Sequence, residues 1–254
     1  MTAGVVLDME GVLHVDWRVL EGAPEAVARL REAGLELAIL TNTTGRTRDG
    51  IAERLEGIGI AFAAGRIVTA ASAAADHLRA QHAGRRVYAL VEPAVRPELD
   101  GLTLVDDPGA ADVILLGGPD DRWTYPRLNA TFRRLLDGVP LVAMQRNRWW
   151  PTVDGPSLDA GMFVAGLEYA AGIEAAVVGK PSPAIYEHAC ALMGVPPGDA
   201  VMVGDDLESD LPPARAVGMR TCLVRTGKGS SFPASADADF DLPALAALPD
   251  ALLG

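Results

Sequence analysis

The sequence predicts an α/β protein built on a parallel sheet. Apolar runs of strand length alternate along the chain with longer segments whose apolar residues recur at helical spacing. This alternation is typical of parallel strands joined by helices that cover both faces of the sheet. With 254 residues, the chain has room for one domain with an insertion or for two domains.

The first part of the chain supplies three strands, each followed by a helix. The strands are expected at 4–8, 35–41 and 67–69, and the helices at 24–33, 47–55 and 71–81. In the first helix, Ala26, Val27 and Leu30 share one face, and the helix is expected to stop at Gly34 because glycine commonly ends helices.

A second unit of the same kind begins near Gly84. Its strands are expected at 87–91, 113–116 and 141–144, and its helices at 125–136 and 161–171. After about Glu174 the chain returns to strands at 175–179, 200–204 and 220–224, which alternate with helices at 183–193 and 211–217. The segment from Lys228 to Asp237 is rich in glycine and serine and is expected to form a mobile loop.

Acidic residues follow two of the expected strands. Asp8 comes directly after Val5-Val6-Leu7, and Asp205 opens an acidic turn after the strand at 200–204. Because ligands bind at the carboxyl ends of parallel strands, the two carboxylates are expected to converge. A hard cation such as Mg²⁺ takes oxygen ligands of this kind. Taken alone, an Asp beside a Gly after a strand is more often only a turn or a helix cap.

Groups suited to a phosphate anion follow two other strands. Thr41 and Asn42 place hydroxyl and amide donors after the strand at 35–41, and Lys180 places a single cation after the strand at 175–179. Acidic residues for a metal and donors for an anion therefore occur at the same edge of the predicted sheet.

The composition excludes several classes of protein. An apolar fraction of 49% with mixed charge is typical of a globular chain. The formal net charge of −12 argues against nucleic acid and anionic membranes as partners, because both would be repelled. The two cysteines, Cys190 and Cys222, lie in apolar contexts and are expected to be buried thiols. No signal peptide or membrane span is apparent, so a cytoplasmic location is expected.

Together, Asp8, Thr41, Lys180 and the Asp205 turn resemble the motifs of the haloacid dehalogenase superfamily of phosphatases and phosphotransferases. The stretches 179–183 and 210–227 look like the NagD-like branch, which has a large inserted cap. The stretches 7–14, 41–44 and 167–170 look closest to the phospholysine phosphohistidine inorganic pyrophosphate phosphatase group. The resemblance implies a Rossmann-like core formed by 1–83 and 175–254, with an α/β cap domain at 84–174.

The resemblance also implies a chemistry, a Mg²⁺-dependent phosphatase for small phosphorylated substrates. Asp8 would attack phosphorus and form an aspartyl-phosphate. Mg²⁺ would be held by Asp8, Asp205 and the backbone carbonyl of Glu10. Three residues would bind the phosphoryl oxygens, namely Thr41, Asn42 and Lys180. Asp206 and Asp210 would order Lys180 and the metal-bound water.

Glu10 departs from the family pattern, because most members carry a second Asp at this position. We expect Glu10 to take the acid/base role, which is worth roughly 10² to 10⁴ in rate. Its extra methylene displaces the carboxylate, so a slow or selective enzyme is expected, and Glu10→Asp is expected to raise turnover. The displaced carboxylate would slow the hydrolysis of phosphoramidates, pyrophosphate and aryl phosphates least, because these substrates have good leaving groups. The alternative is a non-catalytic or weakly active phosphate-binding regulatory protein.

Substrate choice is expected to depend on the loop at 145–155 of the cap. This loop contains Arg146, Arg148, Trp149 and Trp150. Adjacent aromatic residues in a loop cannot both enter one core, so at least one is expected to be exposed or pressed against another domain. The alternative is that these residues only pack the cap. A homodimer formed through the cap also remains open, and His14 is expected to cap a loop rather than to act in catalysis.

Overall fold

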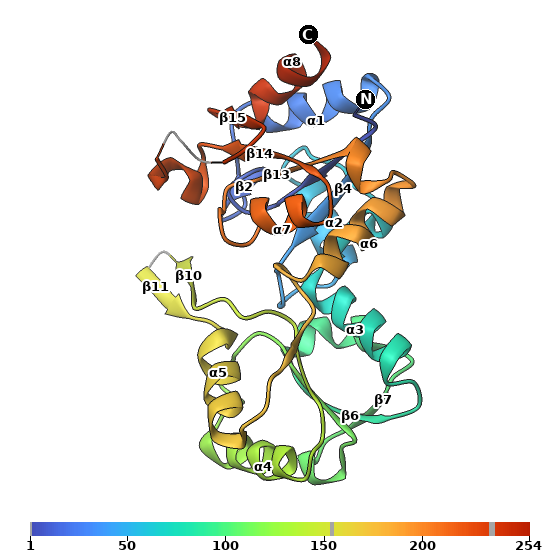
Figure 1. Cartoon of the computed structure of the whole chain (residues 1–254), viewed down its shortest axis with the longest axis vertical. Helices are drawn as coiled ribbons and strands as arrows, with labels where there is room; N and C mark the ends of the chain where they lie inside the picture. Colours follow the sequence, from blue (N-terminus) through green and yellow to red (C-terminus); the bar gives the residue numbers. More distant parts are fainter. Residues whose placement is uncertain (1, 153–154, 234–236) are drawn as a thin grey trace. The chain divides into compact units, whose positions relative to one another are not determined.

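The computed structural model describes residues 2–152, 155–233 and 237–254, and the chain divides into two compact units. The first unit consists of Met1–Thr41, Arg48–Val68 and Lys180–Gly254, and the second of Asn42–Thr47 and Thr69–Gly179. Each unit contains its own sheet and its own helices (Figure 1). The predicted fold class is therefore confirmed.

The sheet of the first unit has six strands. In spatial order they are β15 (Phe240–Leu242), β14 (Arg220–Val224), β13 (Ala200–Gly204), β1 (Gly4–Leu7), β4 (Glu36–Thr41) and β5 (Ile67–Thr69). The pairs β15–β14, β14–β13, β13–β1 and β1–β4 are parallel. Successive residues of a strand point to opposite faces, so Val5 and Leu7 enter one core cluster while Val6, also fully buried, faces the other side.

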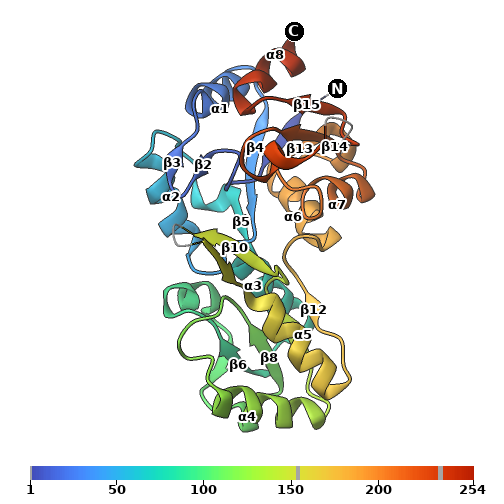
Figure 2. The same cartoon turned by 90° about the vertical axis from the view of Figure 1, so that its left-hand side faces the viewer.

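Helices cover both faces of this sheet (Figure 2). Three helices supply buried residues to the cluster around Val5 and Leu7: α1 (Ala23–Glu32), α2 (Arg48–Glu56) and α8 (Leu248–Leu253). The opposite face carries α6 (Pro183–Met193) and α7 (Leu211–Ala216). A sheet buried on both faces explains why its central strands read as continuous apolar runs.

The register of β1 positions the candidate site. Leu7 lies opposite Ile39 of β4 on one side and Val203 of β13 on the other. The backbone N–H of Asp8 continues this pairing and donates to the carbonyl of Val203 over 2.9 Å. As all three strands run in the same direction, the residues after each of them emerge at one edge.

The second unit has a five-stranded sheet in which every neighbouring pair is parallel. Its spatial order is β12 (Ala176–Val177), β9 (Leu141–Ala143), β8 (Val113–Leu116), β6 (Arg86–Leu90) and β7 (Thr103–Val105). One face packs against α3 (Ala70–Gln81), whose Ala74 and Leu78 are fully buried. The other face packs against α4 (Tyr125–Leu136) and α5 (Ala160–Ala171).

Two segments differ from their predicted assignment. The strand expected at 175–179 as part of the core is only Ala176–Val177, and it pairs with β9 of the second unit. An apolar run shows that a strand forms but not which sheet it joins. The helix expected at 71–81 groups with the second unit, because its buried alanines pack on that sheet. The longer segment of the second unit therefore begins at Thr69, whereas the cap boundary was predicted at residue 84.

Several short elements were not predicted. They are the hairpin of β2 (His14–Val15) and β3 (Arg18–Val19), strand β7, the hairpin of β10 (Trp149–Thr152) and β11 (Gly155–Leu158), strand β15 and helix α8. Part of the predicted loop 228–237 is a 3₁₀ helix, Gly227–Ser231, and residues 234–236 lie outside the described part. Among the described residues, no helix is both long enough and apolar enough to cross a membrane.

Candidate active site

Three buried carboxylates meet at the carboxyl edge of the first sheet. They belong to Asp8 after β1, Asp205 after β13 and Asp210 directly before α7. One oxygen from each of them lies within 4.8 Å of the others. The strand ends were predicted to converge, and the structure places Asp210 in the same group.

Lys180 lies among these carboxylates. Its Nζ is 2.9 Å from Oδ1 of Asp8 and 2.6 Å from Oδ1 of Asp210, and the side chain is only 3% exposed. A charged ammonium in such a buried position requires partners of opposite charge. The two contacts supply these partners, and they place Lys180 beside the residue predicted to be the nucleophile.

The acidic turn after β13 is fixed by hydrogen bonds. The N–H of Lys228 donates to Oδ2 of Asp205 over 2.7 Å, and the Lys228 ammonium lies 2.5 Å from Oδ2 of Asp206. The N–H of Asp206 donates to Asp210, and the hydroxyl of Tyr186 donates to the carbonyl of Ser209. These hydrogen bonds hold the carboxylates of the turn in one arrangement.

The position of the Asp205 carboxylate requires glycine at two neighbouring positions, because a side chain there would overlap with it. A Cβ at Gly11 would come within 2.1 Å of Oδ2 of Asp205, and a Cβ at Gly227 would reach the same oxygen at 2.1 Å. Gly11 also has φ of +81°, a conformation that favours glycine. The hydroxyl of Thr226 donates to the carbonyl of Gly11 and ties the two loops together.

The site has an excess of negative charge. Burial, together with the neighbouring carboxylates of Asp8 and Asp210, raises the pKa of Asp205 to about 8. Burial also raises the pKa of Asp210, although Lys180 opposes this rise. Burial would lower the pKa of Lys180, but the Asp210 and Asp8 carboxylates outweigh it and raise that pKa above its ordinary value. One ammonium thus faces three carboxylates.

This donor set fits a hard divalent cation. All three side chains offer oxygen, which Mg²⁺ and Ca²⁺ prefer, and none offers sulfur or imidazole. Burial, and then repulsion from the Asp8 and Asp210 carboxylates, raises the pKa of Asp205, and a bound cation would oppose this rise by favouring the charged carboxylate. Asp8 and Asp205 are the better candidates for direct ligands, because Asp210 already accepts from Lys180 and from the N–H of Asp206.

The Glu10 side chain does not belong to the group of three carboxylates that the described residues form. Its Oε1 accepts from the N–H of Asp16 over 2.8 Å, and its Oε2 lies 3.1 Å from Nδ1 of His14. The side chain is 50% exposed. A contribution of residue 10 to a metal would therefore come from its backbone carbonyl, as the family resemblance implies.

The predicted phosphate-binding pair belongs to two units. Thr41 is the last residue of β4 and is 4% exposed, so it stands at the same sheet edge as Asp8. Asn42 opens the segment 42–47, which groups with the second unit, and its Nδ2 donates to Oδ1 of Asn147 over 3.4 Å. Their predicted role toward phosphate stays a prediction.

Two of the four predicted specificity residues lie in a hairpin rather than a loop. Trp149 and Trp150 begin β10, which pairs with β11, and they are 49% and 39% exposed. The loop prediction was wrong because Pro151 and Pro156 disfavour strands in the sequence. Arg146 lies 2.7 Å from Oε2 of Glu168 on α5, and both Arg146 and Arg148 are exposed. Val153 and Asp154, also in the predicted loop, lie outside the described residues.

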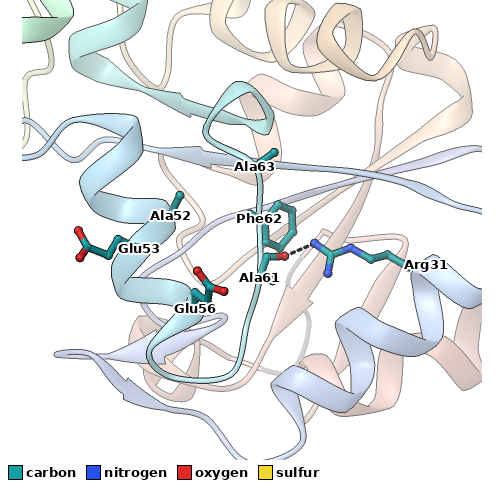
Figure 3. Close-up of a pocket in the computed structure, with 7 residues that line it drawn as sticks. All are labelled: Arg31, Ala52, Glu53, Glu56, Ala61, Phe62 and Ala63. Carbon is teal, nitrogen blue, oxygen red and sulfur yellow. Dashed lines mark hydrogen bonds between the residues drawn. The ribbon is translucent and has the colours of Figure 1, made fainter.

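A cavity on the flank of the first unit contains none of the predicted site residues. Its volume is about 560 Å³, and its lining includes Arg31, Glu53, Glu56 and Phe62. In Figure 3 the Arg31 guanidinium donates to the carbonyl of Ala61, and its central carbon lies 4.5 Å from the centre of the Phe62 ring. Arg31 thus stabilises the loop after α2. The residues that line the cavity do not form a set of converging catalytic groups.

Sequence reasoning missed two residues that support the site, Lys228 and Tyr186. Lys228 falls in a stretch rich in glycine and serine, which indicated only a loop. One signal was present: Lys180 and Lys228 are the only lysines among 254 residues, and both contact the carboxylates of the site. Tyr186 resembles an ordinary core residue of α6, and no sequence signal distinguishes it.

Two family models match parts of this chain. A model described as haloacid dehalogenase-like hydrolase matches residues 5–104, and a HAD-hydrolase-like model matches residues 177–247. The chain belongs to the haloacid dehalogenase-like hydrolase family. Both matches include strand ends of the site, with Asp8 and Thr41 in the first and Lys180, Asp205 and Asp210 in the second.

Relatives of this hydrolase cover most of its length. It is 37% identical to haloacid dehalogenase-like hydrolase domain-containing protein 2 of Homo sapiens, over 88% of this chain and 84% of that protein. It is 35% identical to the phospholysine phosphohistidine inorganic pyrophosphate phosphatase of Danio rerio, over 98% of this chain and 94% of that protein. The suggested relation to that group is therefore confirmed.

Solved structures share the whole fold. The p-nitrophenyl phosphatase from Archaeoglobus fulgidus superposes with a TM-score of 0.92 at 25% identity, covering 98% of this chain and 99% of that one. NagD from E. coli K-12 superposes with a TM-score of 0.85 at 28% identity, covering 97% of this chain and 98% of that one. The predicted relation to the NagD-like branch is thus confirmed.

Proposed function

We propose that this hydrolase is a Mg²⁺-dependent phosphatase that works through a phosphorylated Asp8. The observation that carries the proposal is the buried group of Asp8, Asp205 and Asp210 with Lys180 between two of its members. Family membership and the phosphatase names of its relatives support the reaction class. An acidic chain that handles phosphate needs local positive charge, and Lys180 together with a cation held by these carboxylates would supply it.

Asp8 attacks phosphorus in the first step. Its Oδ1 is paired with Lys180, which leaves the other carboxylate oxygen as the nucleophile. Attack displaces the leaving group and forms an aspartyl-phosphate, so that one difficult displacement becomes two easier ones. Lys180 neutralises the phosphoryl oxygens, which would otherwise repel the incoming carboxylate. Thr41 and Asn42 donate hydrogen bonds to the same oxygens.

Mg²⁺ would be held by Asp8, Asp205 and the backbone carbonyl of Glu10. When bound, it supplies positive charge to the phosphoryl oxygens and orients the phosphate for in-line attack. Asp206 and Asp210 keep Lys180 and the acidic turn in place through their own hydrogen bonds. Glu10 protonates the leaving oxygen and then takes a proton from the water that hydrolyses the aspartyl-phosphate.

The substrates we propose are small phosphorylated molecules with good leaving groups, such as aryl phosphates, phosphoramidates or pyrophosphate. The second unit would supply selectivity through Trp149, Trp150 and Arg148. Arg146, whose guanidinium pairs with Glu168, is proposed for the same role. Cytoplasmic location and a homodimer through the second unit stay predictions.

One observation favours a different function. The acid/base position carries Glu10 instead of the usual Asp, and its carboxylate is bonded to the β2–β3 hairpin. A protein that binds phosphate without turnover would result if this carboxylate could not reach the leaving group. Such a protein would bind Mg²⁺ and inorganic phosphate but would hydrolyse no ester.

Removal of the metal tests the proposal. We expect a chelator to lower the hydrolysis of 4-nitrophenyl phosphate by about a hundredfold or more, and Mg²⁺ in excess to restore it, because the phosphoryl charge is otherwise met by Lys180 alone. The measurement is initial rate against free Mg²⁺, with circular dichroism to show that the chelated protein stays folded. A rate that is independent of the chelator would overturn the metal dependence. Metal binding without hydrolysis of any ester would favour the non-catalytic function.

A further inference from the structure

The β2–β3 hairpin, next to Asp8 in the chain, has a strained tip. Asp16 and Trp17 form the two-residue turn, with φ of +48° and +59°. Such hairpin turns are normally made by Asn, Asp and Gly, so the strain lies mainly at Trp17, whose bulky side chain rarely adopts this conformation. Strain of this kind persists only where surrounding contacts enforce it, and it is common at functional sites.

The contacts that enforce the turn converge on Glu10. The N–H of Asp16 donates to Oε1 of Glu10 over 2.8 Å, and Oε2 lies 3.1 Å from Nδ1 of His14. The N–H of Gly11 donates to the carbonyl of His14 over 2.7 Å, which fixes the hairpin to the loop after β1. Both oxygens of the Glu10 carboxylate are thus held by the hairpin.

His14 is itself rigidly placed. Its side chain is fully buried, and its ring stacks on Trp17 with centroids 4.4 Å apart and an interplanar angle of 20°. The Arg54 guanidinium covers Trp17 at 4.5 Å from the ring centre. The N–H of Trp17 also donates to Nδ1 of His14 over 3.3 Å, a bond that requires Nδ1 to accept, but the Glu10 carboxylate is nearer and charged. The tautomer with a proton on Nδ1, which donates to Glu10, is therefore the better match.

The geometry points to His14 as a positioning residue for Glu10, held in place by the strained β2–β3 hairpin. The inference rests on the proposed function, in which Glu10 is the acid/base group. The Glu10 side chain folds back to contact His14 and the N–H of Asp16. This folded conformation compensates for the methylene by which glutamate is longer than aspartate. An aspartate at position 10 would be too short to make both contacts. The site is therefore built for Glu10, and Glu10→Asp is expected to lower turnover, which reverses the expectation from sequence.

The role of His14 can be separated from ordinary packing by the choice of leaving group. An alkyl phosphate needs a proton on the departing oxygen, whereas 4-nitrophenolate leaves as a stable anion. The ratio kcat/KM reports on the steps up to departure of the leaving group. Misplacement of Glu10 should therefore lower kcat/KM for the alkyl phosphate and leave the aryl phosphate much less affected.

Two substitutions at position 14 have opposite consequences under the two roles. His14→Phe keeps a ring that stacks on Trp17 but removes the donor to Glu10. His14→Asn loses the ring, but its side-chain N–H₂ can occupy the position of Nδ1. If His14 positions Glu10, we expect His14→Phe to lower kcat/KM for the alkyl phosphate by about tenfold to a hundredfold, with His14→Asn close to wild type. If His14 only packs the hairpin, the order of the two variants is reversed.

A Glu10→Ala background completes the experiment. Because His14 is inferred to act through Glu10, adding His14→Phe to Glu10→Ala should lower kcat/KM no further. Thermal unfolding shows whether each variant folds, and His14→Gln, which lacks a donor at the Nδ1 position, replaces His14→Phe if the latter does not. Equal losses for alkyl and aryl phosphates, or full additivity with Glu10→Ala, would overturn the inference. The proposed function would fail separately, if hydrolysis did not require Asp8.

Discussion

Asp8→Asn is expected to lower kcat for every phosphate ester by about 10³-fold or more. An amide cannot attack phosphorus, and loss of a covalent nucleophile is among the most damaging changes in an enzyme of this type. The protein should stay folded, because asparagine has the same shape and removes one of three carboxylates that repel one another. The measurement is kcat for an aryl and an alkyl phosphate with saturating Mg²⁺, alongside a thermal melt.

A matched variant separates the loss of the nucleophile from a general loss of charge. Asp106 lies in the second unit with its side chain 99% exposed, and its contact with Arg96 is long, at 3.8 Å. Asp106→Asn removes the same charge and should change kcat by less than about twofold, as surface substitutions usually have small effects. An Asp8→Asn protein that retains substantial turnover would show that another residue attacks the phosphate.

Lys180→Met should lower both activity and stability. The ammonium contacts Asp8 at 2.9 Å and Asp210 at 2.6 Å, and methionine is of similar length but carries no charge. Loss of one charged group that stabilises a transition state typically costs about 10²- to 10³-fold in kcat. Loss of one partner of a buried ion pair typically costs about 3 to 5 kcal/mol in the free energy of unfolding. We therefore expect both a lower kcat and a lower melting temperature.

The second lysine of the chain provides the control. Lys228 pairs with Asp206 at 2.5 Å, but its side chain is 47% exposed. Its bond to Asp205 comes from the backbone N–H, which Lys228→Met retains. The effect of Lys228→Met on kcat should be at least about tenfold smaller than that of Lys180→Met, because exposed ion pairs contribute little. Equal losses would indicate that total charge matters, rather than the position of Lys180.

The strand ends of the site could be predicted because they depend on local patterns. The apolar runs before Asp8, Thr41 and Asp205 mark buried strands, and parallel pairing brings the ends of such strands to one edge. The sequence pattern could not show the register of the strands or the hydrogen-bond partners of the site residues. That Asp210 accepts from Lys180 depends on the path of the turn between β13 and α7, which no periodicity describes.

Other parts of the fold lacked a sequence signal. The β2–β3 hairpin turns at Asp16 and Trp17, and tryptophan is not a turn residue, so the strained conformation appears only in the structure. Strand β12 has two residues, too few to indicate which sheet it joins. The position of Glu10 could be read from the sequence, but its hydrogen bonds to Asp16 and His14 required the structure.

The central claim is that Asp8 becomes phosphorylated, and trapping this species tests it most directly. Wild-type protein is mixed with Mg²⁺ and excess 4-nitrophenyl phosphate, quenched in acid within one turnover and reduced with borohydride, which converts an acyl phosphate to an alcohol. We predict that peptide mass spectrometry finds homoserine at position 8, and that substrate-free protein contains only aspartate there. Intact Asp8 together with a phosphoryl group on another residue, or with rapid release of phosphate and no modified residue, would contradict the account.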